Sequence, residues 1–386
     1  MSIMPSRQVS GILRWVTATA CLAVVAPNAG AEHGGPGIGG VTVDPTIAPH
    51  VSDNSLSGRI SIAGSDTMRP LVTKLAAQFT TLHPGTQVAV EGTGSASAVR
   101  EFMLGISHQR RGDKVRGRGT TGGSTTVELL ASSRQLTEDE LQGFKSNHGH
   151  RPLEVPIAMD AVAVYVHRDN PIQELSMDQV DAIFGKDHKR GHTPITTWKQ
   201  VGVQTLLGEQ PLHLYGRDRK SGTREFFKHV ALKEGEFRPE VLEQPGSASE
   251  IIAIAQDPLA IGYAGVGFQI SAVRVVPVSS GAGQAAVHPS AESVTSGTYP
   301  LSRSLYLYVK DQKDDMEPEV KAFLGFVNSR QGQETVARAN FYPLPNLQVA
   351  KNRQELGLPP SPLARGNVGE NGLALAGESA GGPTVR

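Results

Sequence analysis

Three stretches of this chain share one order: a short apolar strand, a turn rich in glycine and hydroxyl groups, and a helical run of apolar residues. The first is RISIAG, followed by SDTM and by apolar residues spaced three and four apart as far as Leu82. The second is TQVAVEG with the turn TGSAS, and the third is LHLYGR with the turn DRKSGT. Strands that lead repeatedly through glycine turns into helices predict an α/β fold.

Each of the three turns places polar groups where a helix is expected to begin. The groups are Ser65-Asp66-Thr67, Gly94-Ser95 and Ser221-Gly222-Thr223. A helix N-terminus presents unpaired backbone N–H groups and the positive end of the helix dipole, and small residues let an anion approach closely. Parallel strands end at one edge of a sheet, so we expect the three turns to converge in one crevice.

The third turn is the most specific of the three because cations accompany it. Any one of the turns alone is an ordinary helix cap. Arg217, however, lies four residues before Ser221, and its planar fork can hold two oxygens of a tetrahedral oxyanion. This turn therefore predicts one half of an anion site.

Composition and motifs argue against several classes of function. Acidic and basic residues balance at 37 each, which gives no field that would attract nucleic acid or an anionic membrane. The sequence has no G-x-S-x-G elbow, Walker A motif or H-E-x-x-H motif, so we expect no enzyme. His148 with His150 and His188 with His192 come nearest to metal-ligand spacing. No carboxylates lie in register with them, and we expect no metal and no cofactor.

The first 31 residues have the pattern of a secretory signal peptide. Arg7 and Arg14 precede the apolar run WVTATACLAVVA, and small residues follow at Ala29 and Ala31. The run is too short to span a bilayer, so we expect export to the periplasm. Lipid attachment at Cys21, the only cysteine, is a less favoured alternative because the aliphatic residue expected ahead of it is missing.

Two terminal stretches and one internal segment lack hydrophobic periodicity. We expect residues 32–57 to form a flexible leader and residues 347–386 a disordered tail. Residues 107–126 are polar, basic and rich in glycine, which favours a solvated surface loop. The alternatives are contact with nucleic acid or an acidic surface, for which stacking aromatic residues are missing, and adhesion through Arg111-Gly112-Asp113.

The order of the motifs resembles that of a known family, the periplasmic phosphate-binding component of ABC phosphate importers. The matching segments are ISIAGSDTM, VAVEGTGSA, ASSRQLTEDEL, VPIAMDAVAVYVHRDNP, LSMDQVDAIF, GRDRKSGTREFF, IGYAGVG, YPLSRSLYLYV and FYPLP. The resemblance covers nearly all of residues 58–346. It implies a two-lobed periplasmic-binding-protein fold, in which each lobe is a mixed sheet flanked by helices and two strands form the hinge.

The resemblance also implies domain boundaries and a function. Lobe one would comprise residues 58–157 and 264–346, and lobe two residues 158–263, with hinge strands EVPIAMD and AIGYAGVG. The implied protein is an extracytoplasmic monomer without catalytic activity. It would capture inorganic phosphate and deliver it to an inner-membrane ABC permease.

A set of phosphate ligands follows from the resemblance by matching position. They are Thr67, the backbone of Met68, Ser95, Arg217, Ser221, the backbone of Gly222, and Thr223.

Two positions depart from the family. Its best-studied branch has an aspartate that accepts the proton of the bound phosphate and repels sulfate, whereas this chain has Ser133 there. That task could pass to Asp66 or Asp160. The family's cleft arginine often pairs with an acid two residues later. Here that position is Arg219, so Asp218 or a distant acid would have to serve.

Two other functions remain open. One is binding of another oxyanion, such as sulfate, molybdate or tungstate. The other is hydrolysis of phosphate esters by an exported enzyme, with Ser221 as the nucleophile beside Lys220 and Arg217.

Overall fold

The structure is a computed structural model that describes residues 41–92, 94–104 and 127–359. The signal segment 1–31, with Cys21, lies outside the described residues, as do all of residues 107–126, with Arg111-Gly112-Asp113, and the tail from residue 360. Among the helices that are described, none is long and apolar enough to cross a membrane.

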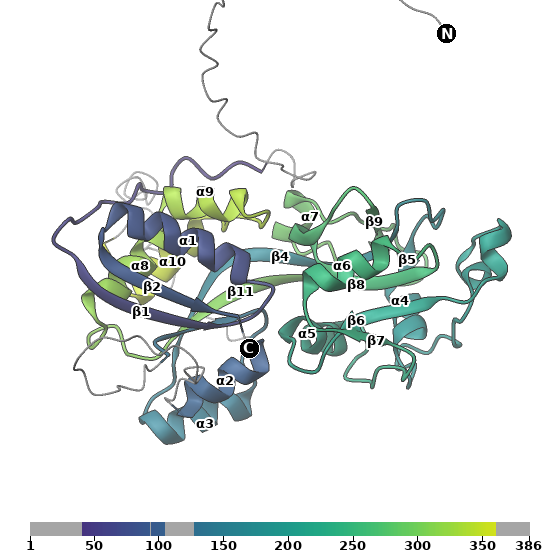
Figure 1. The fold of residues 1–386 in the computed structure, drawn as a ribbon, viewed down its shortest axis with the longest axis horizontal. Coiled ribbons are helices and arrows are strands. Elements are labelled where there is room, and N and C mark those ends of the chain that lie inside the picture. The colour runs from purple at the N-terminus through teal and green to yellow at the C-terminus, as the bar shows by residue number, and fades with distance from the viewer. Residues whose placement is uncertain (1–40, 93, 105–126, 360–386) are drawn as a thin grey trace, which may run out of the picture. The chain divides into compact units, whose positions relative to one another are not determined.

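In the described chain, nine strands form one mixed sheet in the order β2-β1-β3-β11-β4-β8-β6-β7, with β9 paired to β4 outside this path (Figure 1). A two-stranded sheet pairs β5 with β10. The strands are β1 (Ser57–Gly64), β2 (Gly85–Glu91), β3 (Leu129–Ser132), β4 (Leu153–His167), β5 (Leu175–Ser176), β6 (His213–Arg217), β7 (Leu242–Gln244), β8 (Ala260–Gly265), β9 (Val273–Val276), β10 (Val278–Ser279) and β11 (Ser302–Val309).

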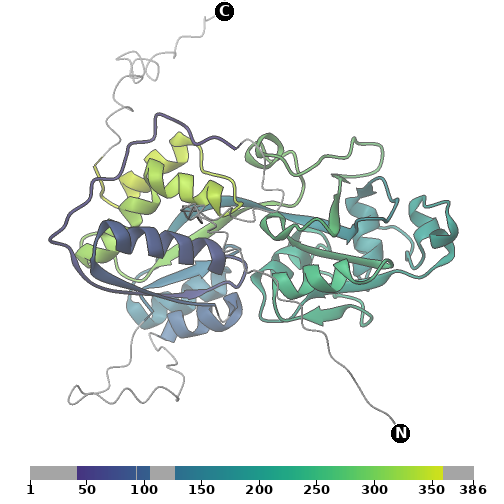
Figure 2. The ribbon, with the colours of Figure 1, turned by 45° about the horizontal axis from the view of Figure 1, so that its top comes forward.

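The three predicted strand–turn–helix units all form, as β1–α1, β2–α2 and β6–α5, and Figure 2 shows α1 lying along β1 and β2. The helices are α1 (Arg69–Leu82), α2 (Ser95–Leu104), α3 (Glu138–His148), α4 (Met177–Phe184), α5 (Gly222–Val230), α6 (Ser247–Ala255), α7 (Ala291–Thr295), α8 (Pro318–Val327), α9 (Arg330–Arg338) and α10 (Asn346–Glu355), with 3₁₀ turns at Trp198–Val201, Leu206–Glu209 and Val266–Phe268. As its spacing predicts, α1 buries one apolar face: Leu71, Val72, Leu75, Ala76 and Phe79.

The long strand β4 takes part in both halves of the sheet. Residues 153–161 pair antiparallel with β11, and residues 162–167 pair antiparallel with β8 and β9. A separate apolar core accompanies each half. One core contains Phe79, Leu307 and Phe323, and the other contains Phe184, Trp198 and Tyr263. The α/β fold is thus two-lobed, as expected.

The predicted second hinge strand is wrong. β8, which holds most of AIGYAGVG, pairs with the second half of β4. β9 also pairs there, and Val276, Val294 and Leu301 pack in the core of that half. β11 is the strand that runs beside the first half of β4. A strand buried on both faces is apolar throughout, and this pattern does not reveal which lobe the strand belongs to.

Two segments that were expected to lack structure are packed on the fold. Ile47, in the expected leader, is fully buried, and Arg330 Nε donates to its carbonyl at 3.1 Å. α10 occupies the start of the expected tail and buries Val349 and Asn352. Ile47, Leu344 and Val349 form one small apolar cluster. These residues meet only in the folded chain, so no local periodicity marks them.

Candidate functional site

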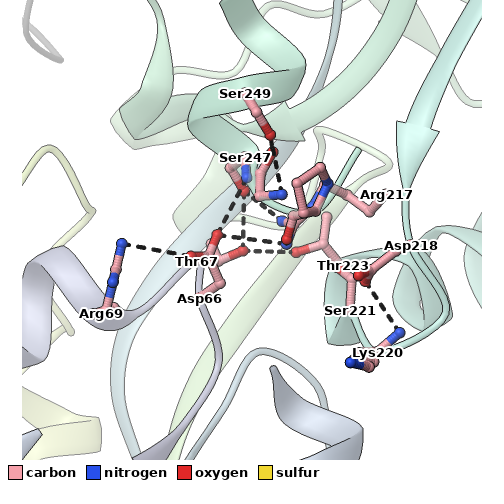
Figure 3. A network of polar contacts seen from close by, with 12 residues as sticks. Asp66, Thr67, Arg69, Arg217, Asp218, Lys220, Ser221, Thr223, Ser247 and Ser249 are labelled. Atoms are coloured by element: carbon pink, nitrogen blue, oxygen red, sulfur yellow. Dashed lines mark hydrogen bonds and ion pairs between the residues drawn. The ribbon is translucent and has the colours of Figure 1, made fainter. Parts of the chain in front are cut away.

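The three predicted turns lie against one another, as Figure 3 shows for the first and third. Thr67 Oγ1 of the first turn is 2.9 Å from Thr223 Oγ1 of the third. The second turn joins them, because Ala96 N donates to the Lys220 carbonyl at 3.2 Å. The N-terminal ends of α1, α2 and α5 therefore meet at one place, which we call the crevice.

Gly222 allows the second and third turns to approach closely. A Cβ atom at this position would stand 2.5 Å from Ser95 Oγ and 2.7 Å from Ser133 Oγ, so only glycine fits. The Ser95 and Ser133 hydroxyls thus lie beside the start of α5. Both serines are fully buried.

Five buried polar atoms around the crevice have no hydrogen-bond partner among the residues that the structure describes. Three can donate, namely Ser95 Oγ, Ser133 Oγ and Arg217 Nε, and two are carboxyl oxygens, Asp160 Oδ1 and Glu250 Oε2. Arg217 is only 1% exposed. Buried polar atoms nearly always have a partner, which is protein, water or a bound group. Two hydroxyls and one guanidinium N–H without partners indicate a site for a group that accepts hydrogen bonds.

The acid that pairs with Arg217 is distant in sequence. Arg217 Nη2 lies 3.4 Å from Asp66 Oδ2, and Arg217 Nη1 donates to Ser247 Oγ at 2.6 Å. Asp218 instead accepts from the Lys220 backbone N–H at 3.1 Å. The side chain of Arg219 is 88% exposed and lies away from the crevice. The Asp66 side chain does not cap α1, and instead its Oδ2 accepts from Ser247 N at 3.2 Å and offsets the charge of the buried guanidinium.

The other predicted carboxylate, Asp160, belongs to a second buried ion pair. Its Oδ2 accepts from Nε and Nη2 of Arg303, at 3.0 and 2.8 Å. Arg303 also donates from Nη1 to the Ser133 carbonyl at 3.1 Å and from Nη2 to Thr223 Oγ1 at 3.0 Å. The crevice thus has two guanidinium groups and two carboxylates, while Ser133 adds no charge.

Two of the predicted ligands use their polar groups within their own turns. The Met68 N–H donates to the Ser65 carbonyl at 3.1 Å. Ser221 Oγ accepts from Arg224 N at 3.3 Å and caps α5. Across the described ranges, no three Asp, Glu, His or Cys side chains are grouped as a metal site requires.

Three buried residues around the crevice were not predicted from the sequence. Ser247 is the first residue of α6 and lies within the sequence PGSAS. The pair Gly246-Ser247 at a helix start is the same signal that predicted Ser95. Arg303 lies within the alternating strand β11, where nothing in the sequence marks an inward-facing arginine. Glu250 on α6 accepts from Tyr263 N at 2.9 Å, and burial raises its pKa to about 8, against the opposing effect of Arg217.

A groove of about 960 Å³ lies beside the crevice, and Arg303 is part of its lining. Arg134, which follows Ser133 in the sequence, also lines this groove. Its Nη1 and Nη2 donate to Glu140 at 2.8 Å each, and its Nε pairs with Glu225 on α5. This ion pair connects the segment after β3 with α5.

Comparison with known sequences identifies the class of protein first. The profile of the PBP superfamily domain matches residues 44–331. The phosphate-binding protein PstS of Pseudomonas aeruginosa is 36% identical over 318 residues, which are 82% of this chain and 92% of that protein. The protein SphX of Synechocystis is 26% identical over 329 residues, 84% of this chain and 86% of that protein. The chain therefore belongs to the PstS family within the PBP superfamily.

Solved structures agree with the fold. A putative phosphate ABC transporter substrate-binding protein of Clostridium perfringens, solved with bound phosphate, has a TM-score of 0.59 at 24% identity. The alignment covers 75% of this chain and 100% of that one. An ABC-type phosphate transport receptor from Vibrio cholerae has a TM-score of 0.56 at 23% identity, with 74% and 100% covered. At these identities the likeness concerns the fold alone.

Proposed function

We propose that this chain is the substrate-binding protein of an ABC importer and captures inorganic phosphate in the crevice. One observation carries the proposal: Ser95 Oγ, Ser133 Oγ and Arg217 Nε are buried around the crevice and have no hydrogen-bond partner in the described chain. Oxygen atoms of a tetrahedral anion would satisfy all three, together with the first N–H groups of α5. The names of the relatives, which specify phosphate binding, support this choice of anion.

The charges of the crevice suit a dianion such as hydrogen phosphate. Arg217 is offset by Asp66 and Arg303 by Asp160, so the buried groups sum to zero before the anion enters. An aspartate at position 133 would add a negative charge and repel a dianion. The Ser133 hydroxyl adds no charge and does not repel a dianion. It can accept a hydrogen bond from a phosphate P–OH group, and it can also donate one. We infer that Ser133 Oγ or Asp160 Oδ1, both buried without a partner in the described chain, accepts the hydrogen bond of that P–OH group.

The remaining parts of the proposal follow from the family. The protein is exported by its first 31 residues, acts in the periplasm as a monomer, and passes phosphate to a membrane permease. We place the lobe boundary within β4, near residue 161, where the strand changes partner. The chain re-enters the first lobe with β11. The ligand set comprises the side chains of Thr67, Ser95, Ser133, Arg217 and Thr223 and the backbone of Gly222.

Calorimetry on protein freed of bound anion by unfolding and refolding tests this function. We expect phosphate to bind with a Kd of about 1 µM or lower, which corresponds to about 8 kcal/mol. Sulfate at the same concentrations should bind more weakly, because it has no O–H group to donate to the buried acceptors of the crevice. Equal or tighter binding of sulfate would shift the assignment to a general oxyanion binder. Release of phosphate from a phosphomonoester at an appreciable rate would favour the hydrolase instead.

Ser133→Asp tests the basis of selectivity in the same assay. A carboxylate there should leave phosphate binding measurable, because it can accept the P–OH proton, and should lower sulfate affinity at least tenfold, or about 1.4 kcal/mol. Ser132→Ala is the matched control. Ser132 is also buried, but its hydroxyl donates to the Arg134 carbonyl at 2.6 Å and lies outside the ligand set.

A further inference from the structure

Three hydroxyl groups form a chain across the crevice, and a guanidinium closes it at each end. Arg217 Nη1 donates to Ser247 Oγ at 2.6 Å, and Ser247 Oγ lies 3.3 Å from Thr67 Oγ1. Thr67 Oγ1 lies 2.9 Å from Thr223 Oγ1, to which Arg303 Nη2 donates at 3.0 Å. Figure 3 shows the Thr67, Thr223, Ser247 and Arg217 part of this chain. All three hydroxyl residues are buried.

The direction of the two arginine–hydroxyl hydrogen bonds determines whether the hydroxyl groups can donate to an anion. A guanidinium donates and never accepts, so Ser247 and Thr223 each use an oxygen lone pair on an arginine. The three hydroxyls have three hydrogens, and only two hydroxyl–hydroxyl bonds lie between them. At least one hydroxyl hydrogen therefore remains free in this network. An anion that enters the crevice meets groups already arranged to donate.

Arg303 is held by Asp160 in a position from which it donates to Thr223 and to the Ser133 carbonyl. Its Nε and Nη2 bind Asp160, its Nη1 binds the Ser133 carbonyl, and its Nη2 binds Thr223, so four of its five N–H groups have protein acceptors. Its side chain is 2% exposed. Arg217 differs, because its Nε has no partner in the described chain. The two arginines therefore have different tasks.

We propose that Arg303 is a positioning residue of the anion site, which fixes the Thr223 hydroxyl as a hydrogen-bond donor to the bound anion. Asp160 holds Arg303 in this position and cancels its charge. Arg303 therefore contributes to anion binding by orienting the Thr223 hydroxyl and not by its net charge. This inference rests on the proposed phosphate function. It assigns to the crevice a second arginine that does not itself contact phosphate.

A double-mutant cycle with phosphate calorimetry tests the inference. The first variant combines Arg303→Met with Asp160→Asn, which removes both charges and leaves no unpaired buried ion. The second is Thr223→Val, and the third carries all three changes. We expect the first and second variants each to weaken phosphate binding about tenfold. If Arg303 acts through Thr223, the third variant should bind no more than about threefold weaker than the weaker of the other two.

The controls separate positioning from folding. Thr223→Ser keeps the hydroxyl and should retain the tenfold sensitivity to the Arg303→Met/Asp160→Asn change. Arg274→Met removes another partly buried arginine, which lies on β9 and donates to the Asn170 carbonyl, and it should leave phosphate binding unchanged. The inference is overturned if the third variant loses phosphate affinity by the product of the two separate losses, or if the first variant binds phosphate as tightly as wild type. Either result leaves the proposed function in place. Failure of the unsubstituted protein to bind phosphate overturns the proposed function and this inference with it.

Discussion

Replacement of Arg217 by methionine removes the charge that is proposed to hold the anion while keeping much of the side-chain volume. Arg217 Nε has no partner in the described part of the chain, and Nη1, which carries two N–H groups, has one acceptor there, Ser247 Oγ. Two N–H groups are thus available to phosphate. Each charge-assisted hydrogen bond is worth about 1.5–3 kcal/mol, so the expected loss is about 3–6 kcal/mol.

That loss corresponds to an increase in Kd of about a hundredfold to ten-thousandfold, measured by calorimetry on anion-free protein. Arg217→Lys keeps a positive charge but not the planar fork, and it should fall between wild type and methionine. Arg219→Ala is the matched control on the same segment. Its side chain is 88% exposed, and its nearest carboxylate, Glu243, is 4.0 Å away, so its Kd should change less than about twofold.

Melting of each variant without phosphate establishes that it is folded. A folded Arg217→Met protein that binds phosphate within about threefold of wild type would refute the reasoning, because the anion would then not depend on the guanidinium. An equal loss in Arg219→Ala would refute it too, since the effect would then belong to the general positive charge of the segment.

Three further predictions follow from buried and partly buried charges. Arg134→Gln breaks the pair with Glu225, which connects the segment after β3 with α5. A partly exposed pair contributes about 0.5–1 kcal/mol, so phosphate should dissociate about two- to fivefold faster in stopped-flow measurements. Burial raises the pKa of Glu250 from 4.5 to about 8, so the unfolded chain releases this proton first. The free energy of unfolding should therefore fall as pH rises from about 5 to 8, by at most about 5 kcal/mol, and Glu250→Gln should remove this slope. Burial and His83 lower the pKa of His50 from 6.5 to about 4, so stability should fall as pH drops from 6.5 to 4. For this half-buried group the loss, after solvent screening, is about 1–2 kcal/mol, and His50→Gln should reduce it in denaturant titrations.

Each of these predictions has a control on the surface of the protein. Arg151→Gln removes an exposed pair with Glu138 and should not change the dissociation rate. Glu243→Gln changes a partly exposed carboxylate and should leave the pH slope between 5 and 8 in place. His192→Gln, at an exposed histidine, should leave the acid slope unchanged. A control that behaves like its partner variant would contradict the assigned cause.

Much of the crevice could be predicted because its parts are local. The turn at Ser221 and the turn at Ser95 each consist of consecutive residues, and a strand, a glycine and a helix in succession position them without help from elsewhere. Thr67 and Thr223 lie 2.9 Å apart, so the predicted convergence occurs. The expected reason was wrong, because β1 and β6 run in opposite directions in the sheet and strand polarity alone does not bring their ends together.

The limits of prediction are equally specific. AIGYAGVG was assigned to the hinge because an apolar run does not show which neighbours will cover it. α10 was missed because its sequence is mostly polar, and its buried apolar residue Val349 packs with Ile47 and Leu344 from other parts of the chain. Ser247 could have been found, since PGSAS repeats the signal of the predicted turns.

The sequence by itself therefore determined the α/β class, the helix starts that donate to an anion, and Arg217, because propensities and turn chemistry act over a few residues. Only the tertiary structure decided how the charges pair. Asp66 lies 151 residues from Arg217, and Asp160 lies 143 residues from Arg303. A buried ion pair depends on which side chains desolvate each other after folding, and no local pattern of residues records that choice.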